Sequence, residues 1–151
     1  MSVNPDFRDL FAALNAEQVD FLIVGGYALA VHGVPRFTKD LDVWVRADQS
    51  NATRVWQALD AFGAPLGTLT LADLEAPGII FQMGVPPNRI DIITGIDGVT
   101  FDEAWKNRVS STYGDQGVMV IGLNELICNK KATGRPQDAL DANTLAQKFP
   151  R

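Results

Sequence analysis

Three aspartates stand in apolar surroundings that are unusual for charged side chains. Asp40 and Asp42 flank Leu41 in "KDLDVWV", and Asp91 lies among isoleucines in "RIDIITG". Alternate residues of a strand share a face, so Asp40 and Asp42 would lie about 7 Å apart. Their repulsion and desolvation call for a positive partner. Mg²⁺ (or Mn²⁺) is the usual one, because it prefers carboxylate oxygens and keeps other positions for water and phosphates.

Asp91 would complete such a site from a neighbouring strand. A lone charge in an apolar strand avoids the core, so we expect Asp91 to face the same way as the pair. Three carboxylates predict two divalent ions about 4 Å apart, an arrangement that clamps the attacking and leaving oxygens of a phosphoryl transfer. The alternative is a solvated strand face for Asp40 and Asp42, and an ion pair between Arg89 and Asp91.

A glycine pair, Gly25-Gly26, ends the apolar run "VDFLIV". Glycine lets the backbone turn sharply and approach a phosphate with no Cβ in the way. The short helix that follows would direct its unpaired N–H groups to the same place. The pattern predicts a phosphate cradle beside the carboxylates, with a plain turn as the alternative.

Hydrophobic periodicity and turn residues place these motifs on alternating helices and strands. The predicted strands are 19–24, 41–47, 79–85, 89–96 and 118–122, with a hairpin between the third and fourth. The predicted helices are one starting at Asn4-Pro5, then 27–33, 51–62, a short turn within 69–78, 100–108, 123–134, and one from Pro136 with Ala142, Leu145, Ala146 and Phe149 inward. The expected class is α+β (α/β-like): a small mixed β-sheet flanked by helices, with a helical tail at about 123–149.

Length and composition predict one domain spanning residues 1–151. The chain is 46% hydrophobic, which is enough for a core, and carries a net charge of −5, which disfavours broad nucleic-acid binding. Its single cysteine excludes a disulfide within the chain. The sequence has neither a leader pattern nor an apolar run long enough for a membrane span, so we expect a cytoplasmic protein with no membrane contact.

The motifs "LIVGG", "KDLDVWV" and "RIDIITG", in this order, resemble those of the polymerase-beta nucleotidyltransferase superfamily. The tail "LNELICNKKATGRPQDALDANTL" is similar to that of small stand-alone nucleotidyltransferase domains and AbiEii-type toxins. The likeness covers roughly residues 19–145. It implies the nucleotidyltransferase fold and transfer of a nucleoside monophosphate from an NTP to an acceptor, with release of pyrophosphate.

The resemblance also implies a role for each matching residue. Asp40 and Asp42 would bind both metals, and Asp91 would bind the catalytic metal and orient or deprotonate the acceptor hydroxyl. Gly25 and Gly26 would contact the β- and γ-phosphates.

The tail would add contacts from the C-terminal helices. Lys130 and Arg135 would reach the triphosphate or the acceptor, and Asp138 would hold one of them in place. Lys130 and Lys131 are consecutive, so at most one of them faces the site. Arg135 follows a helix end, where a cation is favourable for reasons unrelated to substrate.

The chain departs from the family at Tyr27, where Ser or Thr usually helps to hold a phosphate. Tyr27 is the nucleotide-binding candidate at that position, and Arg36, Thr38 and Lys39 could supply the missing phosphate contacts. The same departure motivates an alternative, a catalytically degenerate nucleotide-binding or interaction module. A third hypothesis is an interaction protein whose carboxylates are surface charges.

The sequence leaves the acceptor open among an RNA 3′ end, a protein and a small molecule. A toxin of a toxin–antitoxin pair, with an antitoxin partner, and a homodimer are further expectations. His32, the only histidine, is expected to hydrogen-bond to backbone. Trp44 could stack on a base or pack against a helix.

Overall fold

The computed structural model describes residues 3–34 and 40–148. A mixed six-stranded sheet has the order β3-β4-β2-β1-β6-β5. Its strands are β1 (Phe21–Val24), β2 (Asp40–Val45), β3 (Ile80–Met83), β4 (Arg89–Ile93), β5 (Val109–Tyr113) and β6 (Gln116–Val120). The helices are α1 (Pro5–Ala16), α2 (Gly25–Val31), α3 (Gln49–Phe62), α4 (Leu71–Glu75), α5 (Phe101–Lys106), α6 (Leu123–Ala132) and α7 (Pro136–Lys148), with a 3-10 turn at Leu66–Thr68. The predicted α+β class with a small mixed sheet is confirmed.

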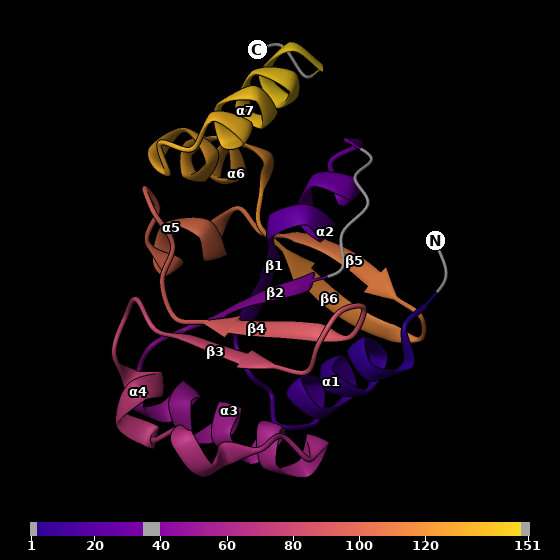
Figure 1. Ribbon diagram of the computed structural model, residues 1–151, viewed down its shortest axis with the longest axis vertical. Coiled ribbons are helices and arrows are strands. Elements are labelled where there is room, and N and C mark those ends of the chain that lie inside the picture. Colours follow the sequence, from indigo (N-terminus) through magenta and orange to yellow (C-terminus); the bar gives the residue numbers. More distant parts are fainter. Residues whose placement is uncertain (1–2, 35–39, 149–151) are drawn as a thin grey trace.

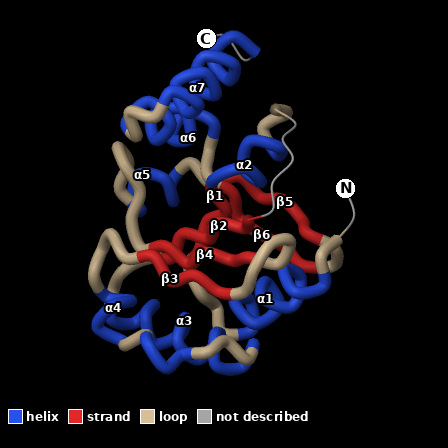
Figure 2. Tube along the Cα trace, viewed as in Figure 1, coloured by secondary structure: helices blue, strands red, loops and turns tan. Residues whose placement is uncertain are grey.

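Helices cover both sides of the sheet. In Figure 1, α1, α3 and α4 lie below the sheet, while α2, α5 and α6 lie above it and α7 is stacked farthest out. Figure 2 shows the strands as a central layer between these two groups of helices. Apolar side chains from both faces fill the core, among them Phe11, Leu22, Trp44 and Leu59.

The central strands set the register of the predicted site. β2 runs parallel to β4 and antiparallel to β1, which places Asp42 beside Asp91 on one side and beside Val24 on the other. β1 stops at Val24, and α2 begins at Gly25 with no intervening loop. The end of β1 therefore lies next to the carboxylates of β2 and β4.

Local sequence explains where the main helices begin and end. The Asn4 side chain caps α1, which has Pro5 in its first turn, and the Asp48 side chain caps α3. Gly63 ends α3 in the left-handed conformation. Thr70 and Thr100 start α4 and α5 with capping boxes.

The prediction missed one strand and misplaced one side chain. β5 pairs with β6 through a turn at Gly114 and Asp115, whereas the sequence predicted no strand between residues 108 and 118. None of the β5 side chains is fully buried, so the strand carries no apolar alternation to reveal it. In α7, Ala142 and Leu145 are buried as expected, but Ala146 is exposed, and Phe149 lies outside the described residues. Among the described residues, no helix is both long and apolar enough to cross a membrane.

Candidate nucleotide and metal site

Adjacent parallel strands bring the aspartates together. Asp42 of β2 and Asp91 of β4 are Cα partners, and Asp40 is paired with Arg89 two residues earlier on each strand. Paired residues of neighbouring strands point to the same face, so the three carboxylates share one side of the sheet. Asp91 is buried, with 9% of its surface exposed. The arrangement places a charge cluster in the N-terminal halves of β2 and β4, and its buried part needs a compensating charge.

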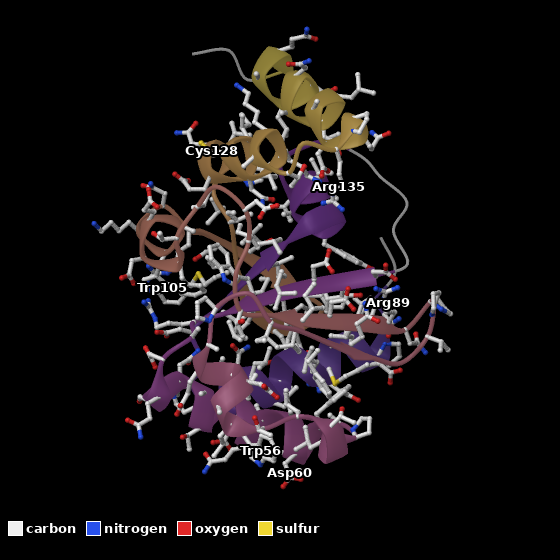
Figure 3. The ribbon with its side chains drawn as sticks, turned by 60° about the vertical axis from the view of Figure 1, so that its left-hand side comes forward. Trp56, Asp60, Arg89, Trp105, Cys128 and Arg135 are labelled. Atoms are coloured by element: carbon white, nitrogen blue, oxygen red, sulfur yellow. The ribbon has the colours of Figure 1, made fainter. Side chains whose placement is uncertain are left out.

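Arg89 supplies part of that compensation. Its Nε and Nη2 each donate to a different oxygen of Asp91 at 3.2 Å, and its Nε lies 3.9 Å from Oδ2 of Asp40. The ion pair considered from the sequence as the alternative for Asp91 is therefore present, and it extends to Asp40. In the view of Figure 3, Arg89 lies near the right-hand end of the strands, and Arg135 lies above it, next to the C-terminal helices.

Asp42 is left without a close cation among the described residues. Its carboxyl forms no ion pair there, although Arg89 and Lys130 act on it from farther away. Burial, followed by repulsion from Asp91 and Asp40, raises the pKa of Asp42 from 3.8 to about 6. The arrangement thus disfavours a third ionised carboxylate at Asp42 unless a cation joins it.

Gly25 lies directly against this carboxylate. Its φ is +70°, and a Cβ at this position would come within 2.2 Å of Oδ2 of Asp42. The glycine is thus required by the close packing of Asp42 as well as by its left-handed backbone. Sequence reasoning gave the glycine pair a phosphate role, and the structure adds this independent constraint.

A cleft of about 780 Å³ opens above Asp42. Its floor contains Gly25, Gly26 and Asp42, and one wall is largely apolar, formed by loop and strand residues around Pro77–Ile80 and Ile93–Asp97. The facing wall is polar and comes from α6, α7 and their connection: Asn129, Lys130, Thr133, Arg135 and Asp138. Asp40, Arg89 and Asp91 lie beside this floor rather than among its lining residues.

The polar wall is held by a buried ion-pair network. Lys130 Nζ lies 3.0 Å from Asp138 Oδ1 and 3.5 Å from Asp141 Oδ2, and all three residues are buried. Thr133 donates its hydroxyl to Asp138 at 2.7 Å, and the exposed Arg135 also reaches Asp138 through Nε at 2.7 Å. Burial opposes ionisation of Asp138, but Thr133, Lys130 and Arg135 together lower its pKa.

Several of these contacts answer questions that the sequence left open. Lys130 faces the cleft while Lys131 is exposed. Asp138 contacts both Lys130 and Arg135. Asp141 was missed, and so were Asn129 and Thr133. The i, i+3 spacing of Asp138 and Asp141 on one helix was the available signal for Asp141.

The Tyr27 side chain does not line the cleft. Its ring packs edge-on against Phe7 and Tyr113, with centroids 5.8 and 6.2 Å away. Burial and the neighbouring Tyr113 raise its pKa. The phenol belongs to an aromatic cluster with Phe7 of α1 and Tyr113 of β5. A nucleotide contact at Tyr27 stays a prediction, and it would involve the Tyr27 backbone.

The remaining candidates divide in three. Arg36, Thr38 and Lys39 lie outside the described residues. His32 Nε2 lies 2.7 Å from the Ile121 carbonyl oxygen, in the structural role expected for it. Trp44 packs edge-on against Phe101 of α5, with ring centroids 5.0 Å apart, which matches the packing alternative.

The donor set fits a hard divalent cation. Carboxylate oxygens are the ligands that Mg²⁺ prefers, and Asp42, which lies beside Asp91, has no close positive partner among residues 3–34 and 40–148. Among the described residues, no three Asp, Glu, His or Cys side chains already converge as a metal site, and Arg89 contacts both oxygens of Asp91. The residues thus suit the ion chemically, provided that Arg89 releases Asp91.

Solved structures share this fold. A candidate nucleotidyltransferase from Thermotoga maritima matches with a TM-score of 0.59 and 15% identity, over 98% of this chain and 95% of that one. The antibiotic-resistance factor ANT(2'')-Ia matches with 0.58 and 13%, over 95% and 81% of the two chains. The lincomycin-bound lincosamide antibiotic adenylyltransferase LnuA matches with 0.58 and 14%, over 96% and 98%. At these identities the likeness establishes the fold.

The sequence itself supplies the family. No curated protein matches the chain. A family model does match it, over residues 5–147, which include both strands of the carboxylate cluster and both helices of the polar wall. The chain belongs to the family described as "Nucleotidyltransferase of unknown function (DUF6036)".

Proposed function

We propose that the protein transfers a nucleoside monophosphate from an NTP to a hydroxyl acceptor with the help of Mg²⁺ or Mn²⁺. The observation that carries this proposal is that Asp42, on the floor of a cleft whose polar wall contains Lys130, is paired with Asp91 on the neighbouring strand beside that floor. The acceptor oxygen forms a bond to the α-phosphorus, the bond to the bridging oxygen breaks, and pyrophosphate leaves. The acceptor proton is released in the same reaction.

Residues in and beside the cleft would have different roles in this reaction. Asp42, Asp91 and Asp40 would hold the cations, and Asp91 would also orient the acceptor hydroxyl. Bound cations would neutralise charge on the phosphates and stabilise the negative charge on the attacking and leaving oxygens. The backbone of Gly25 and Gly26 gives a phosphate room to approach the floor.

The polar wall would meet the triphosphate or the acceptor. Lys130 is fixed by Asp138 and Asp141, so its charge is positioned before substrate binds. Arg135 is exposed at the cleft edge and can turn toward a phosphate while Asp138 anchors it. The two residues add positive charge opposite a floor that is otherwise acidic.

For the acceptor, we propose a small molecule. A cleft of about 780 Å³ lies within the usual range for small-ligand pockets, and its apolar wall offers a surface for a non-polar group. The net charge of −5 also disfavours a long RNA contact. Among the structural neighbours, one is an antibiotic adenylyltransferase solved with lincomycin bound. An RNA 3′ end or a protein acceptor, an AbiEii-type toxin role with an antitoxin, a homodimer and a single domain spanning residues 1–151 remain predictions from the sequence.

The second candidate is a degenerate module that binds a nucleotide without transferring it. The ion pair between Arg89 and Asp91 favours it, because it occupies a carboxylate that catalysis requires. Both candidate functions predict nucleotide binding, but only the active transferase predicts turnover.

Binding is tested first, by thermal unfolding with each of the four NTPs in Mg²⁺ and in EDTA. Wild type is compared with Asp42→Asn, and Asp60→Asn is the matched control because Asp60 is exposed on α3, far from the cleft (Figure 3). Ligand at 100 times its Kd adds about 2.7 kcal/mol of stability. We expect a Mg²⁺-dependent gain with at least one NTP in wild type and Asp60→Asn, and its loss in Asp42→Asn.

Transfer is tested next, with an NTP labelled at the α-phosphate and panels of hydroxyl compounds, RNAs and proteins. Label on a small hydroxyl compound, together with pyrophosphate, supports the proposal. Label on RNA or protein would contradict the small-molecule acceptor, and nucleotide binding without transfer to any panel would favour the degenerate module. Equal NTP stabilisation of wild type and Asp42→Asn would overturn the site itself.

A further inference from the structure

The charges around Asp91 suggest a role for Arg89 that rests on the proposed function. Arg89 begins β4, two residues before Asp91 on the same face, and its Cα partner across the sheet is Asp40. Its guanidinium therefore lies between two of the three carboxylates. It makes a two-pronged contact with Asp91, at 3.2 Å to each oxygen, and a longer one with Asp40 at 3.9 Å.

This position conflicts with a divalent cation at the same carboxylates. Each oxygen of Asp91 accepts one hydrogen bond from Arg89 and keeps a further lone pair, so a divalent ion could ligate Asp91 only with the guanidinium close beside it. Two positive charges at adjacent positions on one carboxylate also repel each other. The Arg89 side chain is one-third exposed, which leaves the guanidinium room to turn toward solvent.

We propose that Arg89 is a resident counter-ion that holds Asp91 and Asp40 in place and is displaced from Asp91 when a divalent cation binds. Arg89 is a positioning residue in this role: it keeps the carboxylate in register in the free protein. It also lowers the affinity of the site for the cation. The cation must compete with an internal charge, so the free protein binds it more weakly than the carboxylates alone would.

The test measures binding of Mn²⁺ alone, from the EPR signal of the free ion, to wild type, Arg89→Gln and Arg89→Lys. Arg108→Gln is the control: it removes the same charge from an exposed arginine stacked 4.0 Å over Trp105, on the other side of the molecule in Figure 3. Even in water, removing a unit charge about 4 Å away changes affinity by about fivefold for an ion of charge +1, and by more for divalent Mn²⁺. We expect Arg89→Gln to bind Mn²⁺ at least about fivefold more tightly than wild type and Arg108→Gln.

Arg89→Lys distinguishes the effect of the positive charge at residue 89 from a merely structural effect of the side chain. It retains the charge and loses the two-pronged geometry, so its Mn²⁺ affinity should stay between those of wild type and Arg89→Gln. Unchanged or weaker binding in Arg89→Gln, or binding in Arg89→Lys as tight as in Arg89→Gln, would overturn the inference.

The outcomes separate this inference from the proposed function. If wild type and Arg89→Gln bind Mn²⁺ equally well, the cation site stands and the role of Arg89 fails. If neither they nor Arg89→Lys bind Mn²⁺, both the inference and the metal-dependent function fail. Tighter binding in Arg89→Gln supports the inference whether or not transfer is later observed.

Discussion

Asp42 is the residue at which charge and burial oppose each other most clearly. Its raised pKa of about 6, caused by burial and by Asp91 and Asp40, means that the folded protein holds a proton there that the unfolded chain releases near 3.8. Between these two values the native state binds more protons than the unfolded state. The free energy of unfolding therefore falls as the pH rises from about 4 to about 6, and the loss is complete above pH 6.

Asp42→Asn should remove this pH dependence. Without divalent cations, we expect the variant to be more stable than wild type at pH 7 by about 2–3 kcal/mol, which corresponds to a pKa shift of about two units. Near pH 3.5 the difference should almost vanish. Urea unfolding in EDTA across this pH range measures it, with Asp60→Asn as the control. A constant difference across the range would mean that Asp42 is ionised at no cost in the fold.

Gly25 gives a second prediction at the residue scale. Gly25→Ala combines a left-handed φ of +70° with a Cβ placed 2.2 Å from the Asp42 carboxylate. Gly63 is a matched control, because its φ is +93° but nothing lies within 4 Å of an added Cβ. We expect Gly63→Ala to cost about 1 kcal/mol from backbone strain alone and Gly25→Ala to cost at least twice as much.

A double variant isolates the contact with Asp42. Combining Gly25→Ala with Asp42→Ala removes the carboxylate that the new Cβ meets, so the extra cost relative to Gly63→Ala should largely disappear in urea unfolding. If the double variant retains the full cost, the strain lies in the backbone of the β1–α2 junction rather than in the packing against Asp42.

At the scale of elements, the α6–α7 hairpin depends on one buried lysine. Lys130→Met would leave Asp138 and Asp141 buried without their shared cation, although Thr133 and Arg135 still contact Asp138. Removing one member of a buried ion pair typically costs about 3–5 kcal/mol, and we expect about 3 kcal/mol here. The control Lys131→Met, which changes the exposed neighbour, should stay within about 0.5 kcal/mol. Equal, small losses in both variants would show that the network contributes little to stability.

The same scale explains how much of the fold could be predicted. The strands that carry Asp42 and Asp91 were found because apolar, largely β-branched residues dominate them, and most of these side chains are buried. β5 was missed because Val109–Tyr113 lies at the sheet edge with no fully buried side chain. The turn at Gly114 and Asp115, between β-branched and polar residues, was the remaining signal for a hairpin.

The sequence predicted which residues form the candidate site, but it did not predict how those residues pair across neighbouring strands. Alternation along a strand correctly indicated that Asp40 and Asp42 share a face, but their register with β4 depends on tertiary packing. Arg89 therefore emerged as an ion-pair partner of Asp91 without its second contact to Asp40. The orientation of the Tyr27 side chain could not be predicted from the sequence either, because it depends on packing against Phe7 and Tyr113, which are distant in sequence.

At the scale of the whole molecule, the cleft joins two parts of the chain that are far apart in sequence. Its floor comes from residues 24–26 and 42 at the ends of the central strands, and its polar wall from residues 129–138 of α6 and α7. Figure 1 shows these two helices above α2 and the strand ends. A ligand that fills the cleft must contact both parts, whereas α3 lies on the opposite side of the sheet.

This arrangement predicts the pattern of amide hydrogen exchange on binding. With Mg²⁺ and the NTP that stabilises the protein most, exchange should slow at least about tenfold both at residues 24–28 and at residues 129–138, because binding suppresses the local openings of each segment. The exchange rates of the α3 amides should slow only as much as the gain in global stability requires. The same NTP in EDTA should protect neither segment strongly. Protection confined to residues 129–138 would place the nucleotide on the helical wall alone, and it would separate nucleotide binding from the carboxylates of β2 and β4.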